Sequence, residues 1–502
     1  VSHEATLNEL KERVGTILDL KRVSALAGWD QQTMMPPAGN DARADQLATI
    51  DRFSHELFVS DETGKLLDQL AESELDPESI DAALVRVTRR DWEKARRIPP
   101  ELQAELTKAE VLGVMAWAEA RRNSDFEAFL PYLEKNVALK HRYLECFKDT
   151  GRSDYDILLD DYQEGARSEE ITAIFERIKE VVIPLIREVK ASEPVPSDFA
   201  HGHFAVEKQE MVGREILERL GYSSESWRLD PTVHPFATSI SVDDIRLTTR
   251  YSEADAESIF HTAHEFGHGI YENGIDRALE RTPLVELNSM VLHESQSRLW
   301  ENLVCRSRPF WRFFFPRIQE VFAEQLGDVT DEMYWRYVNR VQPDFIRVEA
   351  DEVTYGMHII LRYELEQEII AGRLELRDLP GVWNEKMQEY LGLDPPDDAH
   401  GVLQDVHWSG GSFGYFPTYL LGTIASVQIW EKVRSELPDL DSQMEAGEFG
   451  PLREWLGEHM YRWGRRFTPD EMLERIVGGP LDVEPYLAYL QSKVEAIYGV
   501  RV

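Results

Sequence analysis

The sequence predicts a mainly α-helical protein built as one large helical body. Apolar residues recur at three- and four-residue steps over long segments, which is the period of an amphipathic helix. The breaks between these segments are short and rich in proline, so none resembles an interdomain linker. With 502 residues, 42% of them hydrophobic, the chain can bury a large core without disulfides. We therefore expect a single domain over residues 1–502.

The helical pattern is clearest after Ser168, where apolar residues from Ile171 to Leu185 share one face and acidic residues occupy the first turn. Turn-rich breaks fall at residues 98–100, 192–196 and 394–398. Further helices are predicted in Leu7–Ala27, Leu102–Arg121, Asp125–Phe147, Asp331–Arg340, Val353–Ala371 and Val483–Ile497.

Charge excludes two classes of partner. The chain has 92 acidic and 55 basic residues, a net charge of −37, which repels nucleic acids and anionic membranes. No apolar run approaches the ~20 residues that span a bilayer. The segment from Val1 to Arg22 is charged and amphipathic, unlike a signal peptide, and Cys146 and Cys305 are too few for a disulfide framework. We expect a cytoplasmic protein.

One stretch departs from the helical period. In residues 234–251, Ile245 and Leu247 alternate with polar residues such as Arg246, after an Asp243-Asp244 turn and a similar alternation before it. This pattern predicts a β-hairpin.

The next segment, residues 252–274, predicts a helix. Ser252 and Asp255 resemble a capping box, and Asn273-Gly274 is a typical helix end. Gly267 and Gly269 each cost a helix about 1 kcal/mol relative to alanine, which indicates that another group approaches this backbone closely.

This helix carries His264-Glu265-x-x-His268. The i,i+4 spacing puts both imidazoles on one face, where they can bind one zinc ion, and Glu265 can act as general base for a zinc-activated water. His261 lies one turn earlier and is either a further ligand or a neighbour. The alternative is that the histidines are surface residues of an ordinary helix.

A catalytic zinc needs a third protein ligand. The helical stretch Pro283–Val304 carries Glu286, His293, Glu294 and Glu301, and spacing alone does not choose among them.

At this point the chain resembles the Carboxypeptidase Taq family of metallocarboxypeptidases. The resemblance extends over essentially the whole chain and rests on five motifs in the same order: Asp244-x-Arg246-x-Thr248, His264-Glu265-x-x-His268, His293-Glu294-Ser295-Gln296, Ile346-Arg347-x-x-Ala350-Asp351 and Gly401-x-x-Gln404-Asp405-x-His407-Trp408. It implies a helical fold similar to neurolysin and angiotensin-converting enzyme, with a deep substrate groove and a small β-sheet beside the metal. The helices of about residues 1–100 are candidates for a lid over this groove.

The resemblance also implies the chemistry. It selects Glu294 as the third metal ligand, with zinc as the metal and cobalt in some members. Family members are commonly homodimers that remove single amino acids, with broad preference, from the free C-termini of peptides.

Recognition of a free α-carboxylate calls for a fixed arginine. The resemblance points to Arg347, with Arg246 as second choice; for either, the alternative is an internal salt bridge. Gln404 is a weaker candidate for substrate binding, and His234 is a weaker candidate for binding either the oxyanion or the substrate.

Negative charge on the carbonyl oxygen needs a donor beside the metal. His407, Tyr415 and Tyr419 are the candidates, and the glycines between them could form a hinge or an ordinary loop tip. Asp351 and Asp405 are candidates for orienting histidine ligands.

Two other functions fit the same residues. An oligopeptidase would use the zinc to cut internally and would accept amidated peptides. A non-catalytic protein with structural zinc is disfavoured, because Glu265 would be idle and a closed site needs four protein ligands.

Overall fold

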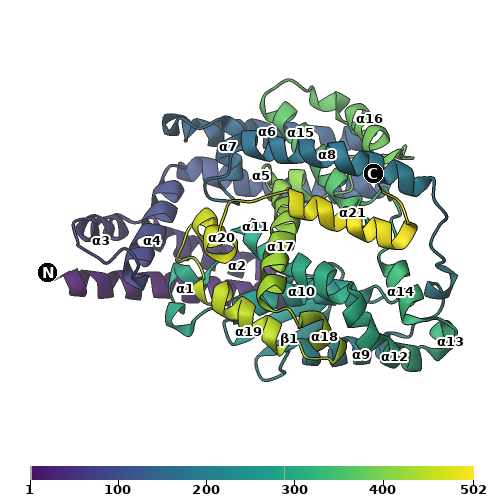
Figure 1. The fold of residues 1–502 in the computed structure, drawn as a ribbon. Helices are drawn as coiled ribbons and strands as arrows, with labels where there is room; N and C mark the ends of the chain where they lie inside the picture. Colours follow the sequence, from purple (N-terminus) through teal and green to yellow (C-terminus); the bar gives the residue numbers. More distant parts are fainter. Residues whose placement is uncertain (1–2, 288, 502) are drawn as a thin grey trace.

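The computed structural model describes residues 3–287 and 289–501, and these residues form the predicted helical body. Figure 1 shows α17 standing in the middle of the molecule, with α6, α7, α8, α15 and α16 above it and α9, α10, α12, α18 and α19 below it. The α-helices are α1 (His3–Thr33), α2 (Asn40–Phe58), α3 (Asp61–Ala71), α4 (Ile80–Arg96), α5 (Pro100–Asn123), α6 (Phe126–Glu145), α7 (Asp154–Leu159), α8 (Ser168–Lys190), α9 (Val206–Leu220), α10 (Ser258–Asn273), α11 (Met290–Arg298), α12 (Arg308–Val321), α13 (Ala323–Leu326), α14 (Asp331–Val338), α15 (Tyr355–Ile370), α16 (Leu379–Leu391), α17 (Pro417–Glu436), α18 (Leu440–Glu445), α19 (Gly450–His459), α20 (Pro469–Val477) and α21 (Glu484–Tyr498). A π-helical segment, η6 (Leu299–Cys305), continues α11.

A three-stranded sheet lies beside α10. Strands β2 (Ala237–Ser241) and β3 (Asp244–Thr249) form the predicted antiparallel hairpin. Strand β1 (Trp227–Pro231) pairs in parallel with β3 and completes the order β1-β3-β2. Ile245 and Leu247 are fully buried, because they face α10 at Gly269.

Helix α10 ends at Asn273 as predicted, but its predicted start is wrong. It begins at Ser258, and Ser252 and Asp255 lie in the preceding loop. Their side chains accept hydrogen bonds from backbone N–H groups two residues ahead, which stabilises turns rather than a helix N-terminus.

The N-terminal helices have a small core of their own. Leu10 of α1, Leu67 of α3 and Leu84 of α4 are fully buried against Leu284. The main core occupies the rest of the molecule, on both sides of α17. Helix α1 also reaches the hairpin, where Arg22 donates to the backbone carbonyl of Ser239. That residues of about 1–100 move as a lid stays a prediction.

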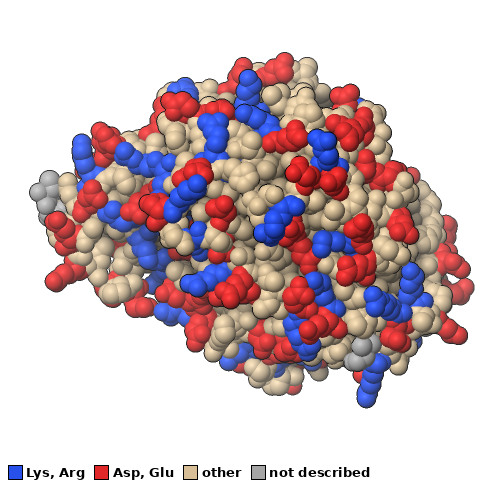
Figure 2. Space-filling model, turned by 90° about the horizontal axis from the view of Figure 1, so that it is seen from above, with Lys and Arg blue, Asp and Glu red and all other residues tan. Residues whose placement is uncertain are grey.

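The surface mixes charges of both signs. Figure 2 shows acidic side chains over the whole visible face, with basic ones scattered between them rather than gathered into one area. Along the described part of the chain, no helix combines the length and low polarity that crossing a membrane requires.

Candidate metal centre and substrate groove

Three glycines let the helices of the site pack closely. A Cβ on Gly267 of α10 would lie 2.4 Å from the carbonyl oxygen of Gln296 in α11, and a Cβ on Gly269 would lie 2.7 Å from the Trp227 ring. On α17, a Cβ at Gly422 would lie 2.7 Å from Cβ of Glu294. The close approach expected at Gly267 and Gly269 is therefore present: α11 packs against α10 at Gly267, and the sheet packs against it at Gly269.

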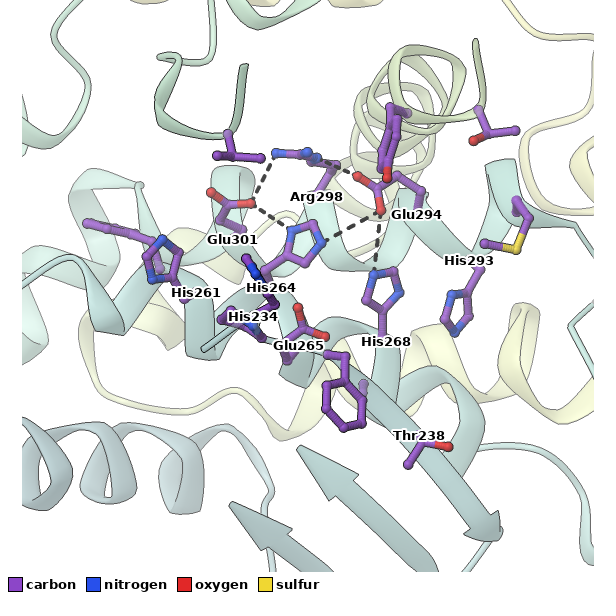
Figure 3. A pocket seen from close by; sticks show the side chains of 18 of the residues that line it. His234, Thr238, His261, His264, Glu265, His268, His293, Glu294, Arg298 and Glu301 are labelled. Atoms are coloured by element: carbon purple, nitrogen blue, oxygen red, sulfur yellow. Dashed lines mark hydrogen bonds and ion pairs between the residues drawn. The ribbon is translucent and has the colours of Figure 1, made fainter. Parts of the chain in front are cut away.

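His264, His268 and Glu294 converge on one point. The Oε2 atom of Glu294 lies 3.7 Å from Nε2 of His264 and 3.5 Å from Nε2 of His268. Figure 3 shows both imidazoles directed toward this carboxylate. Within the described ranges these residues form a group whose ligand atoms all lie within 4.8 Å of one another, which fits a single ion. The side chains thus fit a divalent metal.

The other candidate ligands have different partners. Glu301 accepts from Nδ1 of His264 at 2.9 Å, on the side of the ring away from Glu294. The His293 ring stacks on His268 with centroids 4.2 Å apart, and Nε2 of His293 lies 3.1 Å from Glu272. Glu286 pairs with Lys21 at 2.8 Å. Geometry therefore favours Glu294, the residue that only the resemblance had selected.

Arg298, which sequence reasoning missed, holds both carboxylates of the centre. Its Nε donates to Glu294 at 2.7 Å and its Nη1 to Glu301 at 3.3 Å. Burial alone would lower the pKa of His264, but the charges of Glu294 and Glu301 outweigh it and raise that pKa. The only sequence signal for Arg298 is its i+4 spacing from Glu294.

These groups line a groove with a cavity volume of about 1070 Å³. Glu265 lies in it beside the two histidines, 7% exposed, and burial raises the pKa of this carboxyl to about 7. His261 also lines the groove but lies outside the metal-binding group of the described residues. His234 lines the groove from the loop before β2, as an exposed side chain.

Arg347 lines the same groove and is held by fixed partners. Its Nε and Nη2 donate to Oδ1 of Asp405 at 3.0 and 2.8 Å, and its Nη1 donates to the Tyr355 hydroxyl at 3.1 Å. The internal salt bridge considered for this residue therefore exists, and it orients an arginine that still reaches the groove. Tyr355 was not foreseen from the sequence.

Arg246 and Gln404 are not among the described residues that line the groove. Arg246 pairs with Asp244 at 2.8 Å and lies 4.4 Å from the ring of Trp29 in α1, so its interactions join the hairpin to α1. The Gln404 amide accepts from the backbone N–H of Arg347 at 2.8 Å and donates to the backbone carbonyls of Phe345 and Gly401. These bonds fix the loop that carries Arg347.

The predicted oxyanion donors form a connected cluster. Tyr415 and Tyr419 line the groove with ring centroids 5.2 Å apart. His407 lies behind them, and its Nε2 is 3.2 Å from the Tyr419 hydroxyl. Burial lowers the pKa of His407 to about 4, so its ring is neutral near pH 7. The 407–416 loop is anchored by the buried carboxylate of Glu366.

Neither predicted orienting aspartate contacts a metal-binding histidine. Asp351 accepts from the backbone N–H groups of Gln342, Val353 and Thr354, so it shapes the loop before α15. Asp405 bonds to Arg347, and its Oδ1 lies 3.9 Å from Nδ1 of His407, which is not one of the metal-binding group.

A helical body with a groove, a His-Glu-x-x-His helix and a glutamate from a second helix together define a metallopeptidase. The chain belongs to the Carboxypeptidase Taq (M32) metallopeptidase family, whose model matches residues 9–494.

Relatives match along nearly the whole chain. It is 42% identical to Thermostable carboxypeptidase 1 of Thermus thermophilus, over 99% of both chains, and 39% identical to Carboxypeptidase 1 of Bacillus subtilis, over 95% of this chain and 97% of that one. Its fold matches the crystal structure of the M32 carboxypeptidase from Deinococcus radiodurans with a TM-score of 0.96 at 39% identity, over 99% of this chain and 100% of that one. The protein is a metallocarboxypeptidase.

Proposed function

We propose that the enzyme removes single amino acids from peptide C-termini with broad side-chain preference, using zinc and Glu265 as general base. One observation carries this proposal: Glu265, the His264–His268–Glu294 group and Arg347 line the same groove. The volume of about 1070 Å³ greatly exceeds one side chain, which supports broad preference.

The donor set supports zinc. Two imidazole nitrogens and one carboxylate oxygen are a typical set for catalytic zinc, which leaves a fourth position for water or substrate. When bound, zinc supplies a Lewis acid that polarises the scissile carbonyl and lowers the pKa of a water molecule. Cobalt takes similar ligands, so metal analysis of the purified enzyme has to decide between them.

Glu265 performs the proton transfers. Its carboxylate takes a proton from the attacking water and then gives that proton to the leaving amine. Its position in the groove beside His264 and His268 supports this role, because a water on the metal would lie within its reach.

Tyr415 is the proposed donor to the oxyanion, with Tyr419 and His407 behind it. Both tyrosines line the groove, whereas His407 does not. His407 therefore acts through its contact with the Tyr419 hydroxyl. If Nε2 of the neutral His407 carries the proton, it donates to Tyr419 and leaves the tyrosine hydroxyl protons free for Tyr415 and substrate.

Arg347 is the proposed partner of the substrate carboxylate. Among its five N–H groups, three are directed at Asp405 and Tyr355, and the remaining two can bind a carboxylate bidentately.

The experiment compares two peptides that differ only in a free or amidated C-terminus. Arg347→Ala should lower kcat/KM for the free peptide about a hundredfold, mostly through KM, because a buried charge pair is lost. Arg340→Ala, which removes another groove cation, is the matched control and should change KM little. If Arg347→Ala leaves KM unchanged, the carboxylate binds elsewhere.

The homodimer and the cytoplasmic location expected from the sequence stay predictions. For the homodimer, light scattering should give twice the 58.0 kDa of one chain.

A further inference from the structure

Arg347 shares its carboxylate partner with a second arginine. Oδ1 of Asp405 accepts from Arg347, and Oδ2 accepts from Nε of Arg362 at 2.6 Å. Arg362, on α15, is completely buried, with its guanidinium 4.5 Å from the Trp383 ring centre and 5.4 Å from that of Phe416. Its Nη1 donates to the backbone carbonyl of His358 at 2.6 Å.

Arg362 does not lie on the groove surface. Among the described residues that line the groove, Arg347 is present, whereas Arg362 and Asp405 are not. Arg362 can therefore affect a bound peptide only indirectly, and Asp405 links it to Arg347.

The charges of this cluster explain why a second arginine is needed. A single pair of Arg347 and Asp405 would have no net charge, and Asp405 would repel an incoming carboxylate. Arg362 keeps its proton at physiological pH and cancels the charge of Asp405. The neighbouring rings of His358 and His407 add no charge near pH 7, because burial lowers the pKa of both.

We propose that Arg362 is a positioning residue that balances Asp405, so that Arg347 meets the substrate α-carboxylate with a full positive charge and a fixed orientation. This inference rests on the proposed role of Arg347. It assigns the specificity for a free C-terminus to an arginine–aspartate–arginine cluster rather than to one residue.

Charge-balanced variants test the proposal. Arg362→Met should raise KM for a peptide with a free C-terminus about tenfold, with kcat within about threefold of wild type. Adding Asp405→Asn restores the net positive charge and should return KM to within about threefold of wild type. If the role of Arg362 is purely structural, the double variant should instead have a higher KM than either single variant. Arg362→Lys, which keeps the charge, should resemble wild type.

The same α15 helix provides a matched control. Glu364 also lies between two cations, Lys179 and Lys386, but outside the groove. Lys386→Met removes one of them and should leave KM unchanged.

Binding measurements separate recognition from folding. Calorimetry is carried out on zinc-loaded protein whose circular dichroism spectrum matches that of wild type. Free phenylalanine should bind Arg362→Met more weakly than wild type, whereas binding of phenylalaninamide should change little.

If Arg362→Met does not fold, the double variant decides. A near-normal KM of the double variant supports charge balance, whereas its failure to fold shows a structural role and overturns the proposal. If Arg347→Ala raises KM but the double variant shows no rescue, only this inference fails; if Arg347→Ala has no effect, the proposed function fails with it.

Discussion

Oε2 of Glu301 lies 2.9 Å from Nδ1 of His264, so the other ring nitrogen of this histidine faces Glu294. Carboxylates in this position fix the tautomer of a metal-binding histidine and increase its basicity. Glu301 is fixed in turn by Arg298 and Arg306. We therefore expect the metal site to depend on a carboxylate that is not one of its ligands.

Glu301→Gln should therefore weaken zinc binding by about 10- to 100-fold. Competition with a fluorescent chelator measures this directly. Glu349→Gln, another groove carboxylate, is the control and should bind zinc like wild type. Equal zinc affinity in both variants would remove Glu301 from the metal site.

Glu265→Gln should keep the metal and lose activity by at least about a thousandfold, because the amide cannot accept the proton. Zinc content and peptide turnover are measured on the same preparation. Glu257→Gln, in the groove at the start of α10, should stay active. An active Glu265→Gln enzyme would contradict the mechanism.

Gly422→Ala should lower zinc affinity about tenfold or more, because the new methyl group would overlap with Glu294 and displace its carboxylate. Alanine favours a helix over glycine by about 1 kcal/mol, so weakening of α17 is not the cause. Gly213→Ala in α9 is the control, since nothing lies within 4 Å of its Cβ position. Unchanged zinc affinity would mean that α17 moves to accommodate the methyl group and leaves the Glu294 carboxylate in place.

Glu366 should make stability depend on pH. Its carboxylate accepts from Tyr155, Trp408 and the backbone N–H of Gly414, yet burial raises its pKa from 4.5 to about 7. The folded protein therefore holds a proton that the unfolded chain releases, and this contribution to stability is present below pH 4.5 and is lost as pH rises through about 7.

Relative to wild type, Glu366→Gln should thus gain up to about 3 kcal/mol in free energy of unfolding between pH 4 and 8. Urea midpoints at the two pH values measure this gain. Glu368→Gln, at a partly exposed position on the same helix, serves as control. A constant difference between Glu366→Gln and wild type would show that Glu366 has an ordinary pKa.

Periodicity predicted several of the helices and the hairpin, because these patterns are local. For example, the predicted helix Leu102–Arg121 corresponds to α5, Pro100–Asn123. Strand β1 was missed because it is only five residues long and pairs in parallel with β3, rather than with β2, which follows it in the sequence. The false start of α10 has the same origin, since serine and aspartate stabilise turns as well as caps.

The site was predictable where its chemistry lies on one helix. The spacing of His264 and His268 indicated a metal, whereas the choice of Glu294 depends on how α11 packs on α10 and α17. Glu301 could not be placed because the chain changes to a π-helix at Leu299, which alters the direction of each following side chain. Arg298 precedes this change, and its i+4 spacing from Glu294 does not by itself distinguish it from a surface residue.

The central claim is single-residue release from the C-terminus. A mass-spectrometric time course of the zinc-loaded enzyme on one mid-length peptide with both ends free tests it most directly. We expect a ladder that shortens one residue at a time from the C-terminus, and no cleavage of the same peptide with an amidated end. Internal fragments, or equal cleavage of the amidated peptide, would contradict the account and favour an oligopeptidase.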